Sequence, residues 1–194
     1  MRKKAHISLA NLLLQHHADH KIIHHRKAFC IGNILPDCKP SFFTKKHAFD
    51  HTFEEICEQI VYLSTHPMDT KKQLKQFAIQ LGEVTHHLAD YFTFVHHAHF
   101  DGSLKEHCTY EGKMNHFLKD FIKNTELMLH LHSFHPIEEI QELLFHIEQA
   151  HHVYTMQENR SMHDDCAFII YITSQVMKSI LHYNELYHTS TNHI

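Results

Sequence analysis

The sequence is poor in residues that make tight turns: its 194 residues include only four Gly and four Pro. β-Sandwiches and β-barrels need frequent turns, so this scarcity argues against both and favours long helices. No segment alternates clearly between apolar and polar residues, as a half-buried strand would. We therefore predict an all-α protein, a single-domain multi-helix bundle spanning residues 1–194.

Long apolar runs are also missing, since none approaches the ~18 residues that a membrane-spanning helix needs. The first residues, MRKKAHISLANLLLQHH, are basic and then apolar, as in a signal peptide. The stretch that follows, HHADHKIIHH, offers no small-residue cleavage site, and a helical period continues through it. The sequence thus predicts a cytoplasmic protein without a transmembrane segment.

Cysteine and basic charge are both modest. The five cysteines are scattered, and none forms a Cys-x-x-Cys pair, which argues against a disulfide framework and favours a reducing compartment. Lys and Arg number 18 against 22 Asp and Glu, a net charge of −4 with His neutral. Without a basic excess, no nucleic-acid partner is expected.

Seven helices are expected from apolar periodicity and capping residues. The most apolar stretch, AFIIYITSQVM, lies in the last of them, which we predict to be the central core helix. Pro36 and Pro40 should lift Asp37 out of any helix. The first three expected ranges are 4–18, 20–33 and 52–64. The fourth helix starts after Asp69 or Thr70 and carries the motif at residues 86–97, and the others run from 103 to beyond 129, from Pro136 onward, and over 163–188.

Histidine is the residue in excess, with 26 copies. Two His-x-x-x-acid pairs stand in neighbouring predicted helices: His86 with Asp90, and His107 with Glu111. Residues four apart share one helix face at about 6 Å, so each pair can hold one ion, and imidazole nitrogen with carboxylate oxygen suits Zn²⁺. Random order predicts about three such pairs and the chain has six, so either pair alone is a weak signal.

The order of these residues is more specific than either pair. Leu81-Gly82-x-x-x-His86-x-x-x-Asp90 is followed by His96 and then by His107-x-x-x-Glu111. Upstream lie His6 and the segment FCIGNILPDCKPSFFTKKHAFDHTF. Over residues 6–111 this order resembles the bacterial zinc-dependent phospholipase C family, and the related P1-type nucleases have a similar one. The resemblance implies a multi-helix fold of the phospholipase C and P1 nuclease type with two or three zinc ions.

The resemblance also implies which side chains hold each ion. One zinc would be held by Asp37, His47, His86 and Asp90. A second would be held by His96, His107 and Glu111. A third would involve His6 and the bridging Asp90.

The chain departs from the family pattern at three points. Secreted members use an N-terminal Trp as a ligand, whereas this chain has no Trp. They also have a Pro between the Asp and the next His, where this chain reads Tyr91-Phe-Thr-Phe-Val95; an unbroken helix would present His97, although the resemblance favours His96. After Asp37 the ligand is either His47 or His51, and we slightly favour His47.

The implied activity is hydrolysis of phosphate esters, a phospholipase C-like phosphodiesterase acting on a phospholipid or a small phosphate ester. Zinc would neutralise the phosphate charge and acidify water, with Asp37 as ligand or general base. Phe92, Phe94 and Tyr110 could line the substrate mouth, but aromatic residues at such positions more often belong to the core.

Two other functions fit parts of the sequence. A non-catalytic helical bundle that binds metal, either hemerythrin-like or a metal buffer, would also use His-x-x-x-Glu pairs. His163-Asp164 suggests an HD-type phosphohydrolase, but that class needs a later Asp and none follows Asp165.

Overall fold

The computed structural model describes residues 1–38, 48–66, 68–97, 100–123, 131, 133–158 and 160–191. This part of the chain has no strand, which confirms the all-α prediction. Its α-helices are α1 (Lys3–His16), α2 (Arg26–Gly32), α3 (Phe49–Thr65), α4 (Lys71–Tyr91), α5 (Leu104–Phe121), α7 (Ile140–Thr155) and α8 (Met162–Thr191). Three short 3-10 helices join them: η1 (Lys21–His25), η2 (Pro36–Cys38) and η4 (Phe94–His96).

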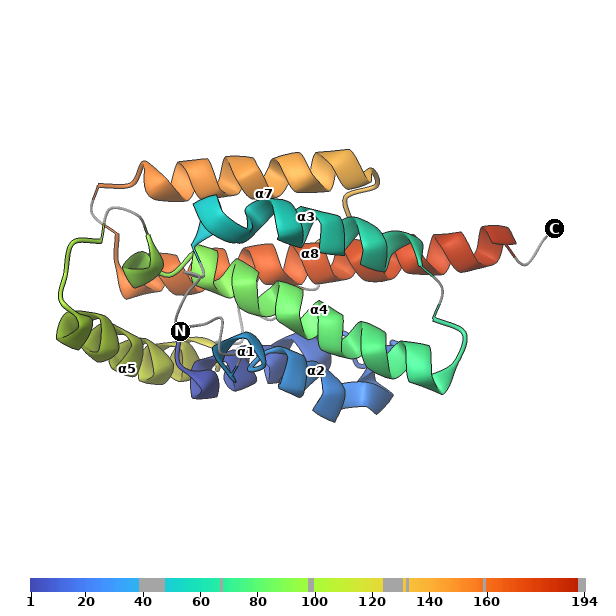
Figure 1. Cartoon of the computed structure of the whole chain (residues 1–194), viewed down its shortest axis with the longest axis horizontal. Coiled ribbons are helices and arrows are strands. Elements are labelled where there is room, and N and C mark those ends of the chain that lie inside the picture. The colour runs from blue at the N-terminus through green and yellow to red at the C-terminus, as the bar shows by residue number, and fades with distance from the viewer. Residues whose placement is uncertain are drawn as a thin grey trace.

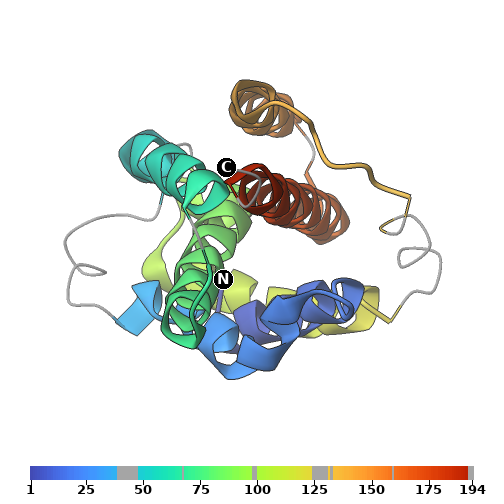
Figure 2. The same cartoon turned by 90° about the vertical axis from the view of Figure 1, so that its right-hand side faces the viewer.

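The helices surround α8 and α4, which contact each other (Figure 1). Helices α3 and α7 lie along one side of this pair, and α1, α2 and α5 lie along the other (Figure 2). Ile169, Ile170, Ile172, Val176 and Met177 of α8 are fully buried, which confirms the prediction that the apolar stretch forms the core helix. Among the described residues, no helix is both long and apolar enough to cross a membrane.

Capping residues set several helix boundaries. Thr70 accepts a hydrogen bond from the Gln73 backbone and starts α4, as predicted, and Ser103 starts α5 in the same way. Other boundaries differ from the prediction. Residues 20–33 form a 3-10 helix followed by a short α-helix, and α7 begins at Ile140 rather than near Pro136. Helix α3 begins at Phe49 rather than Thr52, and α5 ends at Phe121 rather than beyond residue 129.

Two glycines let α2 and α4 come close together. A Cβ on Gly32 would lie 2.0 Å from the Ile79 carbonyl oxygen, and one on Gly82 would lie 2.4 Å from that of Phe29. Both distances are shorter than atoms can approach, so each position requires glycine. This close contact brings the end of α2 against the part of α4 that carries His86.

A buried carboxylate from α8 holds the chain where α4 ends. Asp165 accepts hydrogen bonds from the Phe94 N–H (2.9 Å), the Tyr110 hydroxyl (2.8 Å) and the Tyr154 hydroxyl (2.7 Å). Phe92 has already left the helical conformation, with φ −107° and ψ 28°. Asp165 therefore fixes η4, and with it His96, although no proline lies between Asp90 and His96.

Gly82→Ala tests the contact between α2 and α4. Alanine normally favours a helix interior by about 1 kcal/mol, but here it should lower the free energy of unfolding by about 1–3 kcal/mol through overpacking. Urea unfolding followed by circular dichroism measures the change. Gly112→Ala is the matched control, because a Cβ there meets nothing closer than Arg2 at 3.4 Å; equal effects of the two variants would contradict the packing argument.

Asp165→Ala should cost about 3 kcal/mol or more of unfolding free energy, because three donors around the carboxylate lose their acceptor. Asp164→Ala, one residue away, should cost only about 1 kcal/mol, because Asp164 accepts hydrogen bonds only from Ser161 at the exposed start of α8. Thermal and urea unfolding of both variants give the comparison. Similar losses in the two would show that Asp165 is not a structural hub.

Candidate metal centre

The first group of possible ligands is fully buried and joins α1 to α4. His6, His86 and Asp90 each offer one ligand atom, and these atoms lie within 4.8 Å of one another. Nε2 of His6 is 3.3 Å from Oδ1 of Asp90, and Nε2 of His86 is 3.3 Å from Oδ2. The two imidazoles stack with their centroids 4.0 Å apart.

A second group lies beside the first and is partly exposed. His96, His107 and Glu111 also bring their ligand atoms within 4.8 Å. Oε1 of Glu111 is 3.3 Å from Nε2 of His96 and 3.4 Å from Nε2 of His107. Since His96 belongs to η4 while the other two belong to α5, this group requires the turn that Asp165 fixes.

The two groups meet at Asp90. Its Oδ1 is 3.8 Å from Nε2 of His96 as well as 3.3 Å from His6. The amine of Met1 lies between the groups, 2.5 Å from Asp90, 2.9 Å from His96 and 3.4 Å from Glu111. This cluster of carboxylates and imidazoles therefore accommodates a positive charge at its centre.

The electrostatics favour the neutral form of His6 and His96 and the charged form of the two carboxylates. Burial, reinforced by neighbouring His86, lowers the pKa of His6 to about 3, and burial also lowers the pKa of His96. Burial alone would raise the pKa of Asp90, but His96, the Met1 amine and His86 together hold it well below its usual value. The pKa of Glu111 is lowered in the same way, by hydrogen bonds from His107 and His96 that outweigh burial. Neutral imidazole and ionised carboxylate are the forms that bind metal.

Asn33, a residue that the sequence analysis did not identify, orients His86. Its carbonyl lies 2.8 Å from Nδ1 of His86 and can only accept, so Nδ1 carries the proton. Nε2 is then left with its lone pair directed at Asp90. A hydrogen bond of this kind is the usual support for a metal-binding histidine. Only the tertiary contact between α2 and α4 reveals it.

The structure separates His96 from His97. Because α4 ends at Tyr91, the unbroken helix that would have presented His97 does not form. His97 instead stacks on His151, with 5.4 Å between centroids, and burial, with help from Arg160, lowers its pKa to about 3. Only His96 joins His107 and Glu111.

The remaining predicted ligands differ in position. Asp37 lies in η2 and not in an irregular loop, with Oδ1 3.7 Å from Nε2 of His86. His47 lies outside the described residues. His51 is exposed in the first turn of α3.

A cavity of about 1040 Å³ opens over the second group. Asp37, His96, His107 and Glu111 line it, together with Phe100, which the sequence analysis missed. None of the three aromatic residues predicted to line the mouth is among its described walls.

Those three residues have structural roles. Phe92 is fully buried and stacks on Phe168 at 5.7 Å, so its assignment to the mouth is wrong. Phe94 packs against Tyr110, whose hydroxyl binds Asp165. Phe94 is part of η4, and Tyr110 and Asp165 both contact it.

The His163-Asp164 motif also has a structural role. Asp164 accepts hydrogen bonds from the backbone and hydroxyl of Ser161 at the start of α8, and His163 meets the ring of Phe121 edge-on. Neither residue belongs to the two ligand groups. The HD-type interpretation therefore has no support in this part of the chain.

The two groups fit zinc. They supply imidazole nitrogens and carboxylate oxygens, the donors that zinc binds. Nδ1 of His6 is buried and has no hydrogen-bond partner among the described residues, although buried polar atoms normally have one. A cation bound by both imidazoles would account for two stacked buried rings beside a carboxylate.

Comparison with known proteins identifies the family independently of the site's geometry. A family model described as zinc-dependent phospholipase C matches residues 5–161. Neither the curated proteins nor the solved structures gave a match. The match covers well over half of the chain and agrees with the all-helical structure. The chain thus belongs to the zinc-dependent phospholipase C family and is a zinc-dependent hydrolase of phosphoric esters.

Proposed function

We propose that this protein is a phosphodiesterase whose zinc centre holds two or three ions around Asp90. Asp37, His86 and Asp90, with His47, are the proposed ligands of one ion. A second ion is assigned to His96, His107 and Glu111. A third, if present, is assigned to His6 and Asp90. The proposed substrate is a phospholipid or a small phosphate ester.

The observation that carries this proposal is the shared carboxylate. Asp90 lies within 3.8 Å of imidazoles from both groups, so ions held by them would be close neighbours. Closely spaced ions suit phosphoryl transfer, because attacking and leaving oxygens can be stabilised together. An isolated structural zinc would need only one closed set of ligands.

The residues around the centre have separable tasks. When bound, zinc supplies Lewis-acid chemistry, neutralising charge on the phosphate oxygens and acidifying water. Asp37 lines the cavity next to His86, where its carboxylate can take a proton from the attacking water. Asn33 holds His86 in the tautomer that leaves Nε2 available. The cavity above admits the ester from the side of Phe100 and His107.

Removing a ligand of the first group should remove metal and activity together. The purified protein should contain at least two zinc ions per chain, measured by mass spectrometry of the metals, and should hydrolyse bis(p-nitrophenyl) phosphate. His86→Ala and Asp90→Asn should each lower the zinc content and reduce kcat/KM by about 10²-fold or more. His135→Ala, which breaks an exposed His-x-x-x-Glu pair, is the control and should change neither. Unchanged zinc content in the first two variants would refute the assignment.

Asp37→Asn should affect proton transfer more than metal binding. We expect kcat to fall by about 10²–10⁴-fold at saturating zinc, as for loss of a general base. The zinc assigned to His96, His107 and Glu111 should remain bound, and the amide oxygen of Asn keeps one ligand atom for the first ion. Asp50→Asn, at an exposed carboxylate in the first turn of α3, is the control. If Asp37→Asn kept more than about a tenth of wild-type kcat, Asp37 would not be the base.

A further inference from the structure

Basic side chains are concentrated along one side of the main cavity, the one of about 1040 Å³. Arg2, Lys3 and Lys4, from the start of α1, all line it. The Arg2 guanidinium is held by the Cys108 carbonyl at 2.7 Å. Lys3 and Lys4 are exposed, and no ion pair between described residues involves either of them. Three positive side chains thus lie along one side of the cavity.

The carboxylates of the same cavity do not offset this charge once metal is bound. Among its described walls only Asp37 and Glu111 are acidic, and both are proposed zinc ligands. This step rests on the proposed function. With zinc present, their negative charge would be neutralised at the centre, and Arg2, Lys3 and Lys4 would remain as a net positive wall.

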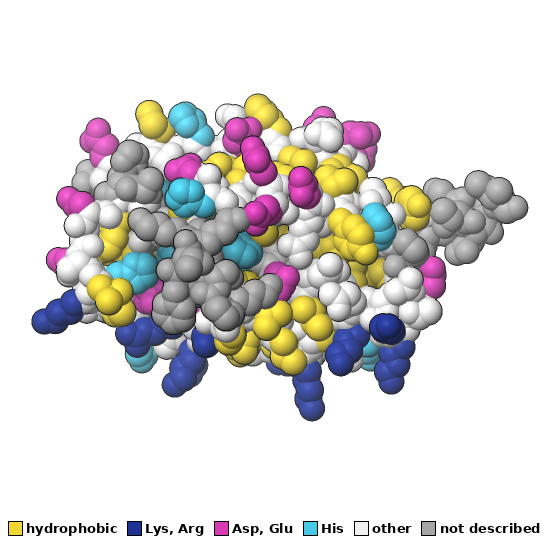
Figure 3. All heavy atoms as spheres, viewed as in Figure 1, with side chains coloured by type: hydrophobic (Ala, Val, Ile, Leu, Met, Phe, Trp, Pro, Cys, Tyr) yellow, Lys and Arg dark blue, Asp and Glu magenta, His cyan; other side chains and the backbone are white. Residues whose placement is uncertain are grey.

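On the side of the metal centre formed by α3 and α7, the charged side chains that line the surface are acidic. A smaller cavity of about 320 Å³ shares Ala48, His96 and His97 with the main one, and it is lined by Asp50 and Glu148. Figure 3 shows the same division over the surface, with Lys and Arg side chains along the lower edge and most Asp and Glu side chains above. An anionic group would be repelled from the α3 and α7 side and attracted to the α1 side.

We propose that the preferred substrate carries a second anionic group besides the phosphate that is hydrolysed, and that Lys3 and Lys4 bind this group. Phe100 and Leu104 line the same cavity, and Leu104 is 79% exposed, so they offer apolar surface to the organic part of the ester. A phosphodiester with a cationic second group, such as choline, is disfavoured in this cavity.

Matched substrates test the preference. Three p-nitrophenyl phosphodiesters would carry a carboxylate, no charge or a trimethylammonium on the second ester group. We expect kcat/KM to be highest for the carboxylate and lowest for the trimethylammonium ester. The double variant Lys3→Glu/Lys4→Glu should lower the ratio of carboxylate to neutral substrate by about tenfold, and 0.5 M salt should shrink this effect.

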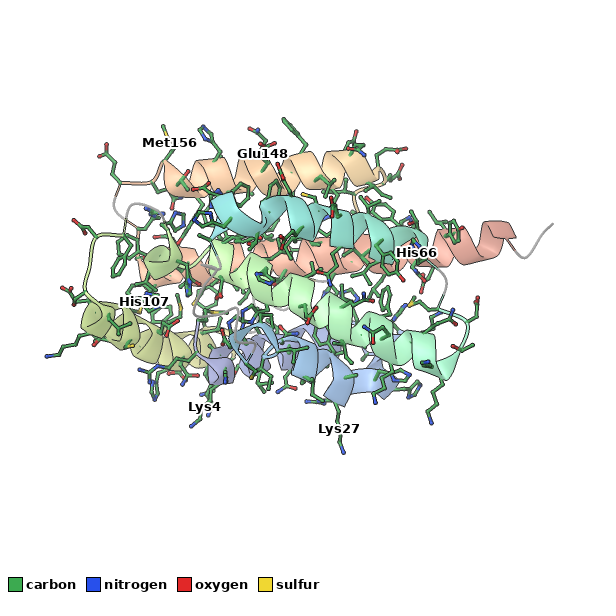
Figure 4. The ribbon with its side chains drawn as sticks, in the orientation of Figure 1. Lys4, Lys27, His66, His107, Glu148 and Met156 are labelled. Carbon is green, nitrogen blue, oxygen red and sulfur yellow. The ribbon has the colours of Figure 1, made fainter. Side chains whose placement is uncertain are left out.

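Lys27→Glu is the matched control. Lys27 projects from the same lower edge as Lys4 but lies on α2, outside the walls of the cavity, whereas Glu148 lies at the opposite edge on α7 (Figure 4). It reverses one positive charge on the same side, where the double variant reverses two. Because Lys27 does not line the cavity, its reversal should leave the substrate ratio unchanged. If both variants lowered the ratio equally, the effect would be general surface charge and the proposal would be overturned.

A lipid comparison identifies the source of the anionic group. Phosphatidylinositol 4-phosphate and phosphatidylinositol, dispersed in the same detergent, differ only in an added phosphate. Preference for the first lipid, lost in Lys3→Glu/Lys4→Glu, would support a lipid substrate; preference only among the soluble esters would support a small metabolite. Equal rates within both sets would overturn the proposal while the enzyme remained active and zinc-loaded. Absence of zinc and of all hydrolysis would instead refute the proposed function itself.

Discussion

The carboxylate of Asp90 is fully buried and meets imidazoles from three segments of the chain: His6 of α1, His86 of α4 and His96 of η4. A buried charge is costly unless it is paired, and the pairing must come from groups placed with good geometry. Here the partners are these three histidines and the amine of Met1, whose positive charge helps keep the carboxylate ionised. The helices that meet at Asp90 are therefore arranged around an electrostatic requirement as well as an apolar core.

Contacts between helices away from Asp90 place the histidines that pair with its carboxylate. Gly32 and Gly82 bring α2 and α4 into backbone contact, which places the Asn33 carbonyl against His86. Asp165 on α8 holds the Phe94 N–H and thereby the turn that presents His96. His86 and the turn that carries His96 are thus each held by a hydrogen bond from another part of the fold, the kind of support that a metal centre needs to keep its geometry.

The centre also lies on an electrostatic boundary. On its α1 side, Arg2 and the two lysines line the larger cavity; on its α3 and α7 side, Asp50 and Glu148 line the smaller one. Family membership accounts for zinc and for phosphoric ester hydrolysis. The choice among esters would then depend on this difference in charge across the site, because the proposed metal ligands would act on the hydrolysed phosphate only through the bound ions.

The sequence by itself determined the helical class, the approximate starts of α4 and α5, and the candidate ligand pairs four residues apart, because helical periodicity and capping act over a few residues. It also carried the ligand order that resembles the family. It left His96 and His97 open, and it suggested Phe92 for the mouth, because both questions depend on where α4 stops. Only the tertiary structure shows where α4 stops. Asp165, some seventy residues further along the chain, accepts a hydrogen bond from the Phe94 N–H and fixes the turn that follows the end of α4 at Tyr91. The orientation of His86 and the charge on the two sides of the cavity were likewise decided by contacts between distant helices, which no local pattern encodes.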